Sequence, residues 1–543
     1  MSERLWLKNY PVSMNLDYPE VGVYDYLKQY CESYPDMIAL VFMGNEVTYK
    51  EMQDNINRVA AALLDLGIKK GDRIALMLPN CPQYVYAYYA CMKIGATVVQ
   101  MNPLYTPREA EHILTDSGAR IYLGADAVFN SFHQVRDKVP VEKVIVTRLM
   151  FNEVEGDNLW LEELMQQYPP EAPAADIDPK EDVAIFQYTG GTTGLPKAAM
   201  LTQYNVLCNL IQSKEWIRDW IDEKFKDGVK QTYGISVLPF FHSYGMSVAM
   251  NTGLTIPSGQ ILVPRFEPEM VLDLIKKYEP GLFPAVPTMY TAIASHPDAD
   301  KYNVDTVEVC NSGAAPMPIE AMKKFESKTG SKILEGYGLS EASPVTHCNP
   351  LRGERKPGSI GIPYPDTDAK IVDLESGTKE MPVGQEGELI VKGPQVMKGY
   401  WNRPEETASS LRDGWLYTGD IAKMDEDGYF YIVDRKKDMV LTGGYNVYPR
   451  EIDEVLFEHP KVLEAVTAGI PDDYYGEMIK AYVVLNEGET ATEDEIFEFM
   501  KDKLAKYKIP KEIEFRQELP KTNVGKILRR ELVEEEKKKR GQK

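Results

Sequence analysis

The sequence predicts an α/β protein in which a large N-terminal domain of several subdomains precedes a small α+β domain. The first 180 residues alternate helical patterns with short β-branched runs, which is typical of parallel strands covered by helices. Residues 54–66 (DNINRVAAALLDL) form an amphipathic helical pattern, and the strand-like run RIALMLP follows at residues 73–79. The same order returns in CMKIGATVVQM and in ARIYLGA. We therefore expect layers of helices and sheets in this part of the chain.

Beyond about residue 355 the pattern changes to short apolar runs broken by Gly and Pro: SIGIP, DAKIVD, GELIVKG and GYFYIVD. This spacing predicts small sheets or a small β-barrel. A basic tripeptide, RKK at residues 435–437, then marks a junction. We expect a large domain over residues 1–434 and a small domain over residues 435–543.

The small domain shows helix, strand and helix patterns at residues 451–459, 480–485 and 493–504. It carries 21 basic and 23 acidic side chains, whereas the large domain carries 40 and 60, so the formal net charge of −22 belongs almost entirely to the large domain. An acidic surface argues against a nucleic-acid partner, because polyanions are held by basic surfaces. Any anionic substrate must therefore be met by local positive charge.

The six cysteines and six histidines show no metal-ligand spacing, so a zinc site is not expected and the thiols are interpreted as reduced. The first residues, MSERLWLKNYPVSMNLDYP, lack the succession of a signal peptide. The most apolar stretch, residues 82–101, is interrupted by Gln83, Lys93 and Gly95, which favours a buried helix followed by a strand over a membrane span. We expect a cytoplasmic protein.

Residues 188–197, YTGGTTGLPK, combine three glycines, three threonines and a terminal lysine. Backbone N–H groups, hydroxyls and one cation are what a triphosphate needs. The run is not a Walker A loop, because no Gly precedes Lys197 and Ala198 stands where Ser or Thr would bind magnesium. The strand-like runs VAIFQYT and KAAMLT flank the loop, and Thr202 is placed to cap the following helix. A flexible surface hairpin is the alternative interpretation of such a loop.

The loop closely resembles the phosphate loop of the adenylate-forming superfamily, which contains acyl-CoA synthetases, firefly luciferase and the adenylation domains of nonribosomal peptide synthetases. Further motifs follow in the order of that family: FFHSYG (240–245), SGAAP (312–316), EGYGLSE (335–341), YTGD (417–420), DRKKD (434–438), GGYNVYPREID (443–453) and PKTNVGKILRREL (520–532). The resemblance implies two half-reactions, in which a carboxylate and Mg-ATP give an acyl-adenylate and coenzyme A then displaces AMP. It also implies that the small domain is mobile.

The resemblance implies a nucleotide site. It implies that Tyr337 offers a flat face to the purine, that Asp420 accepts hydrogen bonds from two ribose hydroxyls, and that Arg435 contacts the ribose. Outside the family context, Asp420 reads as an acid in a glycine turn. The other nucleotide contacts implied are Thr189, Gly190, Gly191, Thr192, Thr193, Gly194, Lys197, Gly313, Ala314, Ala315, Glu335, Gly336, Gly338 and Ser340.

Glu341 is a hard oxygen ligand of the kind that magnesium prefers. The resemblance implies that Glu341, with Thr189, binds the Mg²⁺ ion that bridges the ATP phosphates. Taken alone, this glutamate would more often be a solvated turn residue. Ser340 stands before it where threonine is commoner in the family.

Lys526 corresponds to the catalytic lysine of the family, whose charge neutralises the α-phosphate during adenylation. Outside the family context, a lysine in a lysine-rich tail is a surface charge. Lys437 occupies the hinge position, and Gly443 and Gly444 lie on the loop that lines the thiol tunnel in the family, although a plain hairpin turn also explains them. Three further lysines are assigned to a solvated face in preference to a coenzyme A contact: Lys506, Lys508 and Lys511.

The acyl pocket is expected around His242, which falls where the family has an aromatic residue or His at the pocket mouth. Met246, Val286 and Pro287 belong to an uncharged apolar set that also includes Val248, Ala249 and Pro284. Outside the family context, a lone His among apolar residues is more often a satisfied core residue.

Taken together, the sequences of the motifs most resemble those of bacterial long-chain fatty acid–CoA ligases. Two departures matter: Met246 stands where well-known long-chain enzymes have a gating tryptophan, and Leu441 where some have a lysine. A medium-chain or aryl-acid CoA ligase therefore stays open, and a non-catalytic nucleotide-binding regulator is a remote alternative. A peptide-synthetase adenylation domain is disfavoured because His242 replaces the expected acid and the chain ends within 17 residues of Lys526. The resemblance allows for a homodimer and for peripheral contact with the inner face of the membrane.

Overall fold

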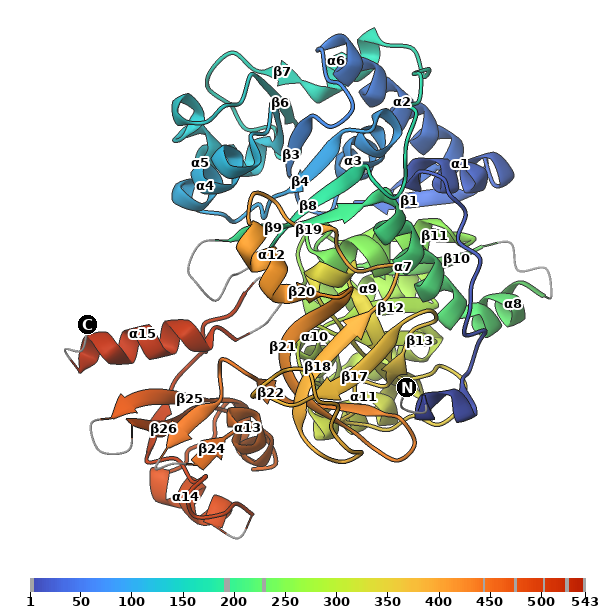
Figure 1. Ribbon diagram of the computed structural model, residues 1–543. Helices are drawn as coiled ribbons and strands as arrows, with labels where there is room; N and C mark the ends of the chain where they lie inside the picture. Colours follow the sequence, from blue (N-terminus) through green and yellow to red (C-terminus); the bar gives the residue numbers. More distant parts are fainter. Residues whose placement is uncertain are drawn as a thin grey trace.

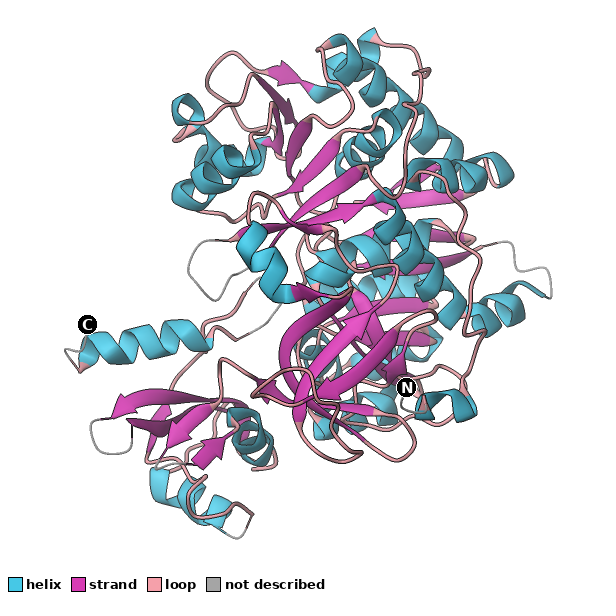
Figure 2. Cartoon of the chain, in the orientation of Figure 1, coloured by secondary structure: helices cyan, strands magenta, loops and turns pink. Residues whose placement is uncertain are grey.

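A computed structural model describes residues 4–189, 196–226, 231–442, 445–472, 476–501, 503–522 and 527–540 (Figure 1). The chain begins in the part drawn in blue and ends in a smaller part drawn in orange and red. The strands form two large sheets, and helices cover both of them (Figure 2). The predicted α/β class is confirmed.

The first large sheet follows the strand order β19-β9-β8-β4-β3-β5-β6-β7. Its central strands are parallel, as the alternating sequence pattern predicts. The strand bounds are β3 Arg73–Met77, β4 Thr97–Gln100, β5 Ile121–Ala125, β6 Lys143–Thr147, β7 Leu159–Trp160, β8 Val183–Thr189, β9 Lys197–Thr202 and β19 Gly399–Tyr400. β8 and β9 are antiparallel neighbours, so the predicted phosphate loop connects their ends.

The second large sheet follows the order β16-β15-β14-β13-β12-β10-β11-β1-β2. Strands β10 to β14 are parallel to their neighbours in this sheet, except that β14 and β15 are antiparallel. The bounds are β1 Ile38–Phe42, β2 Asn45–Thr48, β10 Thr232–Ser236, β11 Ser258–Leu262, β12 Leu282–Ala285, β13 Val309–Ser312, β14 Lys332–Gly338, β15 Val345–Cys348 and β16 Ile362–Pro363.

Successive side chains of a strand point to opposite faces of the first sheet, and each face packs into a different hydrophobic core. Ile74 and Leu76 of β3 pack with the helices α2 and α3, whereas Ala75 and Met77 pack with α4 and α5. The helices that cover the two large sheets are α1 Val23–Ser33, α2 Tyr49–Asp65, α3 Pro82–Ile94, α4 Pro107–Ser117, α5 Phe129–His133, α6 Leu161–Gln167, α7 Gln203–Trp216, α8 Arg218–Lys226, α9 Pro268–Tyr278, α10 Pro287–Ser295 and α11 Ile319–Thr329. Thr202 caps α7 as predicted, through reciprocal bonds with Asn205.

The two large sheets share one core, in which α3, α7 and the π-helix η4 (Gly245–Thr252) lie between them. The expected helix and strand at residues 82–101 are confirmed as α3 and β4. In the described part of the chain, no helix combines the length and the apolar character that crossing a membrane requires.

A five-stranded antiparallel sheet follows, in the region where small sheets or a barrel were predicted. Its bounds are β17 Asp368–Val372, β18 Gly387–Lys392, β20 Leu411–Arg412, β21 Trp415–Met424 and β22 Phe430–Arg435, with the helix α12 at Pro404–Ser410. β22 pairs with β21 and leads into the last part of the chain.

The C-terminal part has its own sheet and its own buried clusters, drawn from residues 440–532. The expected helix, strand and helix are confirmed there as α13 (Pro449–Phe457), β26 (Gly476–Leu485) and α14 (Glu493–Lys501). The remaining elements are β23 Val440–Thr442, β24 Tyr445–Val447, β25 Val462–Asp472, β27 Glu512–Phe515 and α15 Arg529–Lys539.

Candidate active site

Three segments that carry predicted nucleotide residues lie at the ends of strands. Thr189 ends β8, and Ser312 ends β13. Gly338 ends β14, which runs parallel to β13, so these two carboxyl ends share one edge of the sheet. Ligands of open α/β sheets bind at this edge. The candidate active site is therefore placed by the strand directions.

Glu341 lies at the centre of the site, in the short helix η7 (Ser340–Ala342) that follows β14. Its Oε1 atom accepts a hydrogen bond of 2.8 Å from the Tyr400 hydroxyl, and the Thr189 Oγ1 atom lies 3.5 Å from the same oxygen. Its backbone carbonyl accepts the Met397 N–H at 2.8 Å. Three distant segments of the chain therefore meet at one carboxylate.

Lys197 supplies the cation of the site. Its Nζ atom lies 3.7 Å from the centroid of the Tyr400 ring, a geometry in which the face of the ring attracts the charge. Tyr400 is held in place because β19 pairs with β9, with Tyr400 opposite Ala199. Burial lowers the pKa of Lys197, whereas the Glu341 carboxylate acts in the opposite direction. The lysine and the glutamate are thus joined through one tyrosine.

A second cluster forms around Asp420, whose carboxylate is buried. The Tyr337 hydroxyl donates to its Oδ2 atom, and the Arg435 Nε atom lies 3.5 Å from its Oδ1 atom. The antiparallel register of β21 and β22 sets Asp420 opposite Arg435. Burial and the Asp420 charge raise the pKa of Tyr337, so the phenol stays protonated and donates. A carboxylate has about four acceptor positions, so further donors can bind Asp420.

The segment after β13 adds a strained backbone. Ala314 has φ = 68°, in the left-handed region that a residue with a side chain rarely adopts, and its side chain is exposed. Gly313 precedes it and Ala315 follows it. Strain of this kind is often found at functional sites. It fits the predicted role of this segment in nucleotide binding.

Four further residues of the predicted site have contacts inside the fold. The Glu335 side chain is buried and accepts the Gly358 N–H at 3.0 Å, and burial raises the pKa of Glu335 to about 7. A Cβ atom at Gly338 would lie 2.3 Å from the Pro344 carbonyl oxygen, so glycine is required there by packing, whereas at Gly336 it would meet Asn311 at 3.2 Å. The Ser340 hydroxyl lies 3.5 Å from that of Ser243.

His242 lies three residues before Gly245, the first residue of the π-helix η4. Its Nδ1 atom accepts the Tyr244 N–H at 3.2 Å, which leaves the proton of the neutral ring on Nε2. Gly245 begins the π-helix with no room for a side chain, since a Cβ atom would lie 2.2 Å from the Pro239 carbonyl. Helices of this type occur frequently at functional sites.

A cavity of about 50 Å³ lies against η4. It is bounded mainly by apolar groups of η4, β12, β13 and their neighbours, including Val248, Ala249, Thr252, Pro284 and Asn311. Met246 and Val286 are buried close by in sequence but do not line the cavity, and neither do His242 and Pro287. Of the apolar set that the sequence suggested, Val248, Ala249 and Pro284 line the cavity, whereas the four residues assigned to the acyl pocket do not.

Several predicted residues lie outside the described part of the chain: Gly190, Gly191, Thr192, Thr193, Gly194, Gly443, Gly444 and Lys526. Lys437 is exposed in the turn that follows β22. Lys508 forms an ion pair with Glu451, and Lys506 and Lys511 are exposed, which supports the prediction of a solvated face.

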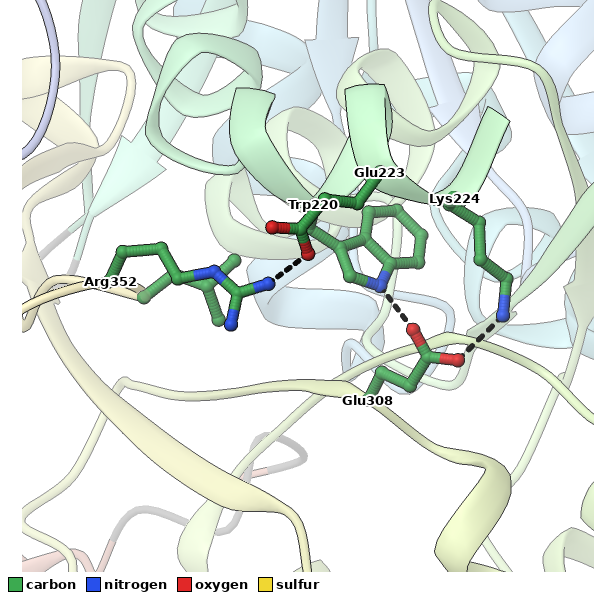
Figure 3. A pocket seen from close by; sticks show the side chains of 6 residues that line it. Trp220, Glu223, Lys224, Glu308 and Arg352 are labelled. Carbon is green, nitrogen blue, oxygen red and sulfur yellow. Dashed lines mark hydrogen bonds and ion pairs between the residues drawn. The ribbon is translucent and has the colours of Figure 1, made fainter. Parts of the chain in front are cut away.

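A surface hollow of about 400 Å³ lies apart from this site (Figure 3). It adjoins Glu308, which precedes β13, and so lies near the amino end of the strand whose carboxyl end adjoins the site. Lys224 pairs with Glu308, and Arg352 pairs with Glu223. Because the charged groups that line the hollow neutralise one another, we do not assign it to the site.

Comparison with known proteins identifies the family. The model of the AMP-binding enzyme family matches residues 27–401, and that of the AMP-binding enzyme C-terminal domain matches residues 451–526. The chain belongs to the AMP-binding enzyme family. Membership of the adenylate-forming superfamily, as the motifs predict, is thereby confirmed.

Individual relatives span nearly the whole chain. A long-chain-fatty-acid–CoA ligase of Bacillus subtilis (strain 168) is 44% identical over 559 residues, which covers 98% of this chain and 98% of the relative. Two crystal structures of MatB from Rhodopseudomonas palustris are 31% identical to this chain and cover 95% of it and 99% of MatB. The TM-score is 0.86 for ATP-bound MatB and 0.76 for apo MatB.

Tyr400 is the residue of the site that sequence reasoning did not assign. It falls in the run KGYWNRP, where nothing but the adjacent aromatic pair distinguishes it. Its contacts to Glu341 and Lys197 span 59 and 203 positions of sequence, so they emerge only when the strands are paired.

Replacement of Tyr400 by Phe keeps the ring against Lys197 and removes the hydrogen bond to Glu341. Because hydrogen bonds to charged groups contribute about 1.5–3 kcal/mol, we expect ATP affinity to fall roughly tenfold or more. Calorimetric titration with ATP measures the change.

Tyr168→Phe is the matched control, since the Tyr168 hydroxyl donates to the Asp65 carboxylate between the ends of the helices α6 and α2. An unchanged ATP affinity in Tyr400→Phe, or an equal loss in the control, would show that this hydroxyl does not order the site.

Proposed function

We propose that this chain is an AMP-forming long-chain fatty acid–CoA ligase. The observation that carries the proposal is the 44% identity to a long-chain-fatty-acid–CoA ligase over nearly the full length of both chains. The site supports it, because Lys197, the Glu341 carboxylate and the cluster around Asp420 gather in one protein that also holds an apolar cavity. ATP, coenzyme A and a fatty acid are then the substrates.

The reaction proceeds in two steps. A carboxylate oxygen of the fatty acid attacks the α-phosphorus of ATP, and the bond to the bridging oxygen breaks, so that pyrophosphate leaves. The thiol of coenzyme A then loses its proton to solvent, its sulfur attacks the carbonyl carbon of the acyl-adenylate, and AMP leaves with the bonding pair. The mixed anhydride of the first step turns a poor electrophile into a good one.

Lys197 is proposed to contact the phosphates, with its position set by Tyr400. Tyr337 is proposed to face the purine, while Asp420 and Arg435 bind the ribose. ATP and coenzyme A are polyanions and the chain carries a net charge of −22, so local cations must offset the acidic surface. Lys197, Arg435, Lys437 and Lys526 are the candidates for that compensating charge.

Mg²⁺ is proposed to be held by Glu341 and Thr189 together with phosphate oxygens of ATP. The two side chains fit, because their oxygens lie 3.5 Å apart and both are hard donors. In the described part of the chain no three His, Cys, Asp or Glu side chains gather to form a metal site. Magnesium is commonly bound by one or two carboxylates plus substrate phosphates. When bound, the ion would neutralise phosphate charge.

The remaining assignments rest on the motifs. We propose a large domain over residues 1–434 and a small domain over residues 435–543, with the hinge at Lys437. Gly443 and Gly444 are proposed to line the path of the coenzyme A thiol. The separate buried clusters of residues 440–532 support this division. A cytoplasmic location stays a prediction from the sequence, and so does the lack of a nucleic-acid partner, which the acidic composition disfavours because polyanions are held by basic surfaces. Homodimer formation and peripheral membrane contact stay predictions from the resemblance.

Lys526→Ala is expected to abolish adenylation, with a loss on the order of 3 kcal/mol or more of transition-state stabilisation. Thioester formation from supplied acyl-adenylate should largely survive, because its charge development lies elsewhere. Pyrophosphate release and thioester formation are measured separately.

Lys521→Ala is the matched control, since Lys521 pairs with Glu464 inside the small domain. Equal losses in both half-reactions of Lys526→Ala would refute the assigned role.

Ala249→Val is expected to shift the preference from palmitate toward octanoate. Ala249 lines the cavity, and two added methyl groups remove space that the far part of a long chain would fill. Each buried methylene contributes about 0.8 kcal/mol, so the palmitate-to-octanoate ratio of kcat/KM should fall severalfold. A panel of palmitate, octanoate and benzoate measures it.

Ala465→Val, at a buried alanine of the small domain, controls for overpacking. A wild-type preference for benzoate would replace the long-chain assignment by the aryl-acid alternative. An unchanged ratio in Ala249→Val would place the acyl chain away from the cavity.

A further inference from the structure

The large and small domains meet at Asp434, in strand β22. This strand pairs with β21 of the large domain, with Asp434 opposite Ile421. The Asp434 side chain is only 2% exposed. Its Oδ2 atom accepts the Arg450 N–H at 3.0 Å, in the first turn of α13. The carboxylate thus lies at the positive end of a helix that belongs to the small domain.

Arg529, the first residue of α15, lies among three carboxylates. Its Nη1 atom lies 3.5 Å from Asp434 Oδ1 and 3.7 Å from Asp438 Oδ2, and its Nη2 atom pairs with Asp453 of α13. Burial opposes the charge of Arg529, but the three acids outweigh burial and its pKa is raised. The Arg529 side chain is 23% exposed, and its three acidic partners fix the position of the guanidinium.

Arg450 of the small domain also forms a hydrogen bond to the large domain. The Arg450 Nη1 atom donates to the Ile432 carbonyl of β22 at 2.6 Å, while its Nε atom pairs with Glu454 on its own helix at 3.0 Å. The two domains are therefore connected both by Asp434 of β22 and by Arg450 of α13.

The helix α15 is fastened to the sheet of the small domain by a further buried ion pair. Lys480 of β26 lies 2.9 Å from Glu536 of α15, and these side chains are 7% and 6% exposed. Arg540 also pairs with Glu536, at 2.8 Å. These contacts stay within the small domain, so α15 and the sheet move together.

We propose that Asp434 and Arg529 form a latch across the hinge at Lys437, which holds the small domain in the arrangement described here. Rotation about Lys437 would separate Arg529 from Asp434 but not from Asp438 or Asp453, because both follow the hinge. Arg529 follows Lys526 by three residues, so Arg529 is a positioning residue for that lysine. This last step rests on the proposed function.

The latch is assigned to the adenylation step. The ground for this assignment is that Arg529 lies in the sequence three residues after Lys526, the lysine proposed for adenylation. An interaction that exists in one arrangement only can stabilise only the step carried out there.

Asp434→Asn and Arg529→Lys test the latch, because each keeps a polar group while weakening the pair. We expect the single-turnover rate of adenylation to fall on the order of tenfold with the ATP KM nearly unchanged, while thioester formation from supplied palmitoyl-adenylate stays within twofold. The double variant should be no slower than the slower single variant, since both remove one interaction.

Arg540→Gln is the control, because it weakens the ion pairs of α15 without touching Asp434. Equal losses in both half-reactions, additive losses in the double variant, or the same loss in Arg540→Gln would overturn the latch.

Failure of the wild-type enzyme to adenylate palmitate would refute the proposed function instead, so the two failures are distinguishable. Thermal unfolding of each variant identifies losses caused by misfolding, and Asp434→Asn, which keeps the acceptor for the Arg450 N–H, remains informative if Arg529→Lys is unstable.

Discussion

The hydrogen bond between Tyr400 and Glu341 is the interaction on which the candidate active site depends. It joins the edge strand β19 to the loop after β14, and so ties the first large sheet to the second. The same tyrosine places its ring against Lys197, so one residue orders a carboxylate and a cation together. In a chain with a net charge of −22, a polyanionic substrate requires such a preorganised local arrangement. The electrostatics of the site therefore follow from sheet pairing.

The second constraint is where the strands end. β13 and β14 end together at one edge of their sheet, and β21 and β22 bring Asp420 and Arg435 to Tyr337. The π-helix η4 and the apolar cavity lie between the large sheets, where an acyl chain would be shielded from water. A polar nucleotide site next to an apolar cavity is what joining a fatty acid to ATP requires. The cross-hinge contact of Asp434 and Arg529 extends this order into the small domain.

Local patterns predict much of this architecture. Periodicity locates α2, α3 and β3, and the capping signal at Thr202 predicts the start of α7, because these depend on neighbouring residues. Ordered motifs predict Glu341, Asp420 and Arg435. Tyr400, Arg529 and the internal bonds of Glu335 escape prediction, because their partners lie far away in sequence and are set by strand pairing and domain contact. The cavity escapes for the same reason, since packing between sheets decides which apolar side chains line it.

The central claim is that the fatty acid is activated by transfer of AMP before coenzyme A takes part. The most direct measurement is the exchange of labelled pyrophosphate into ATP, with palmitate present and coenzyme A absent. We predict exchange that depends on palmitate, because the first half-reaction is reversible and needs no thiol. Exchange that appears only after coenzyme A is added, or no exchange by an enzyme that still forms palmitoyl-CoA, would contradict the claim.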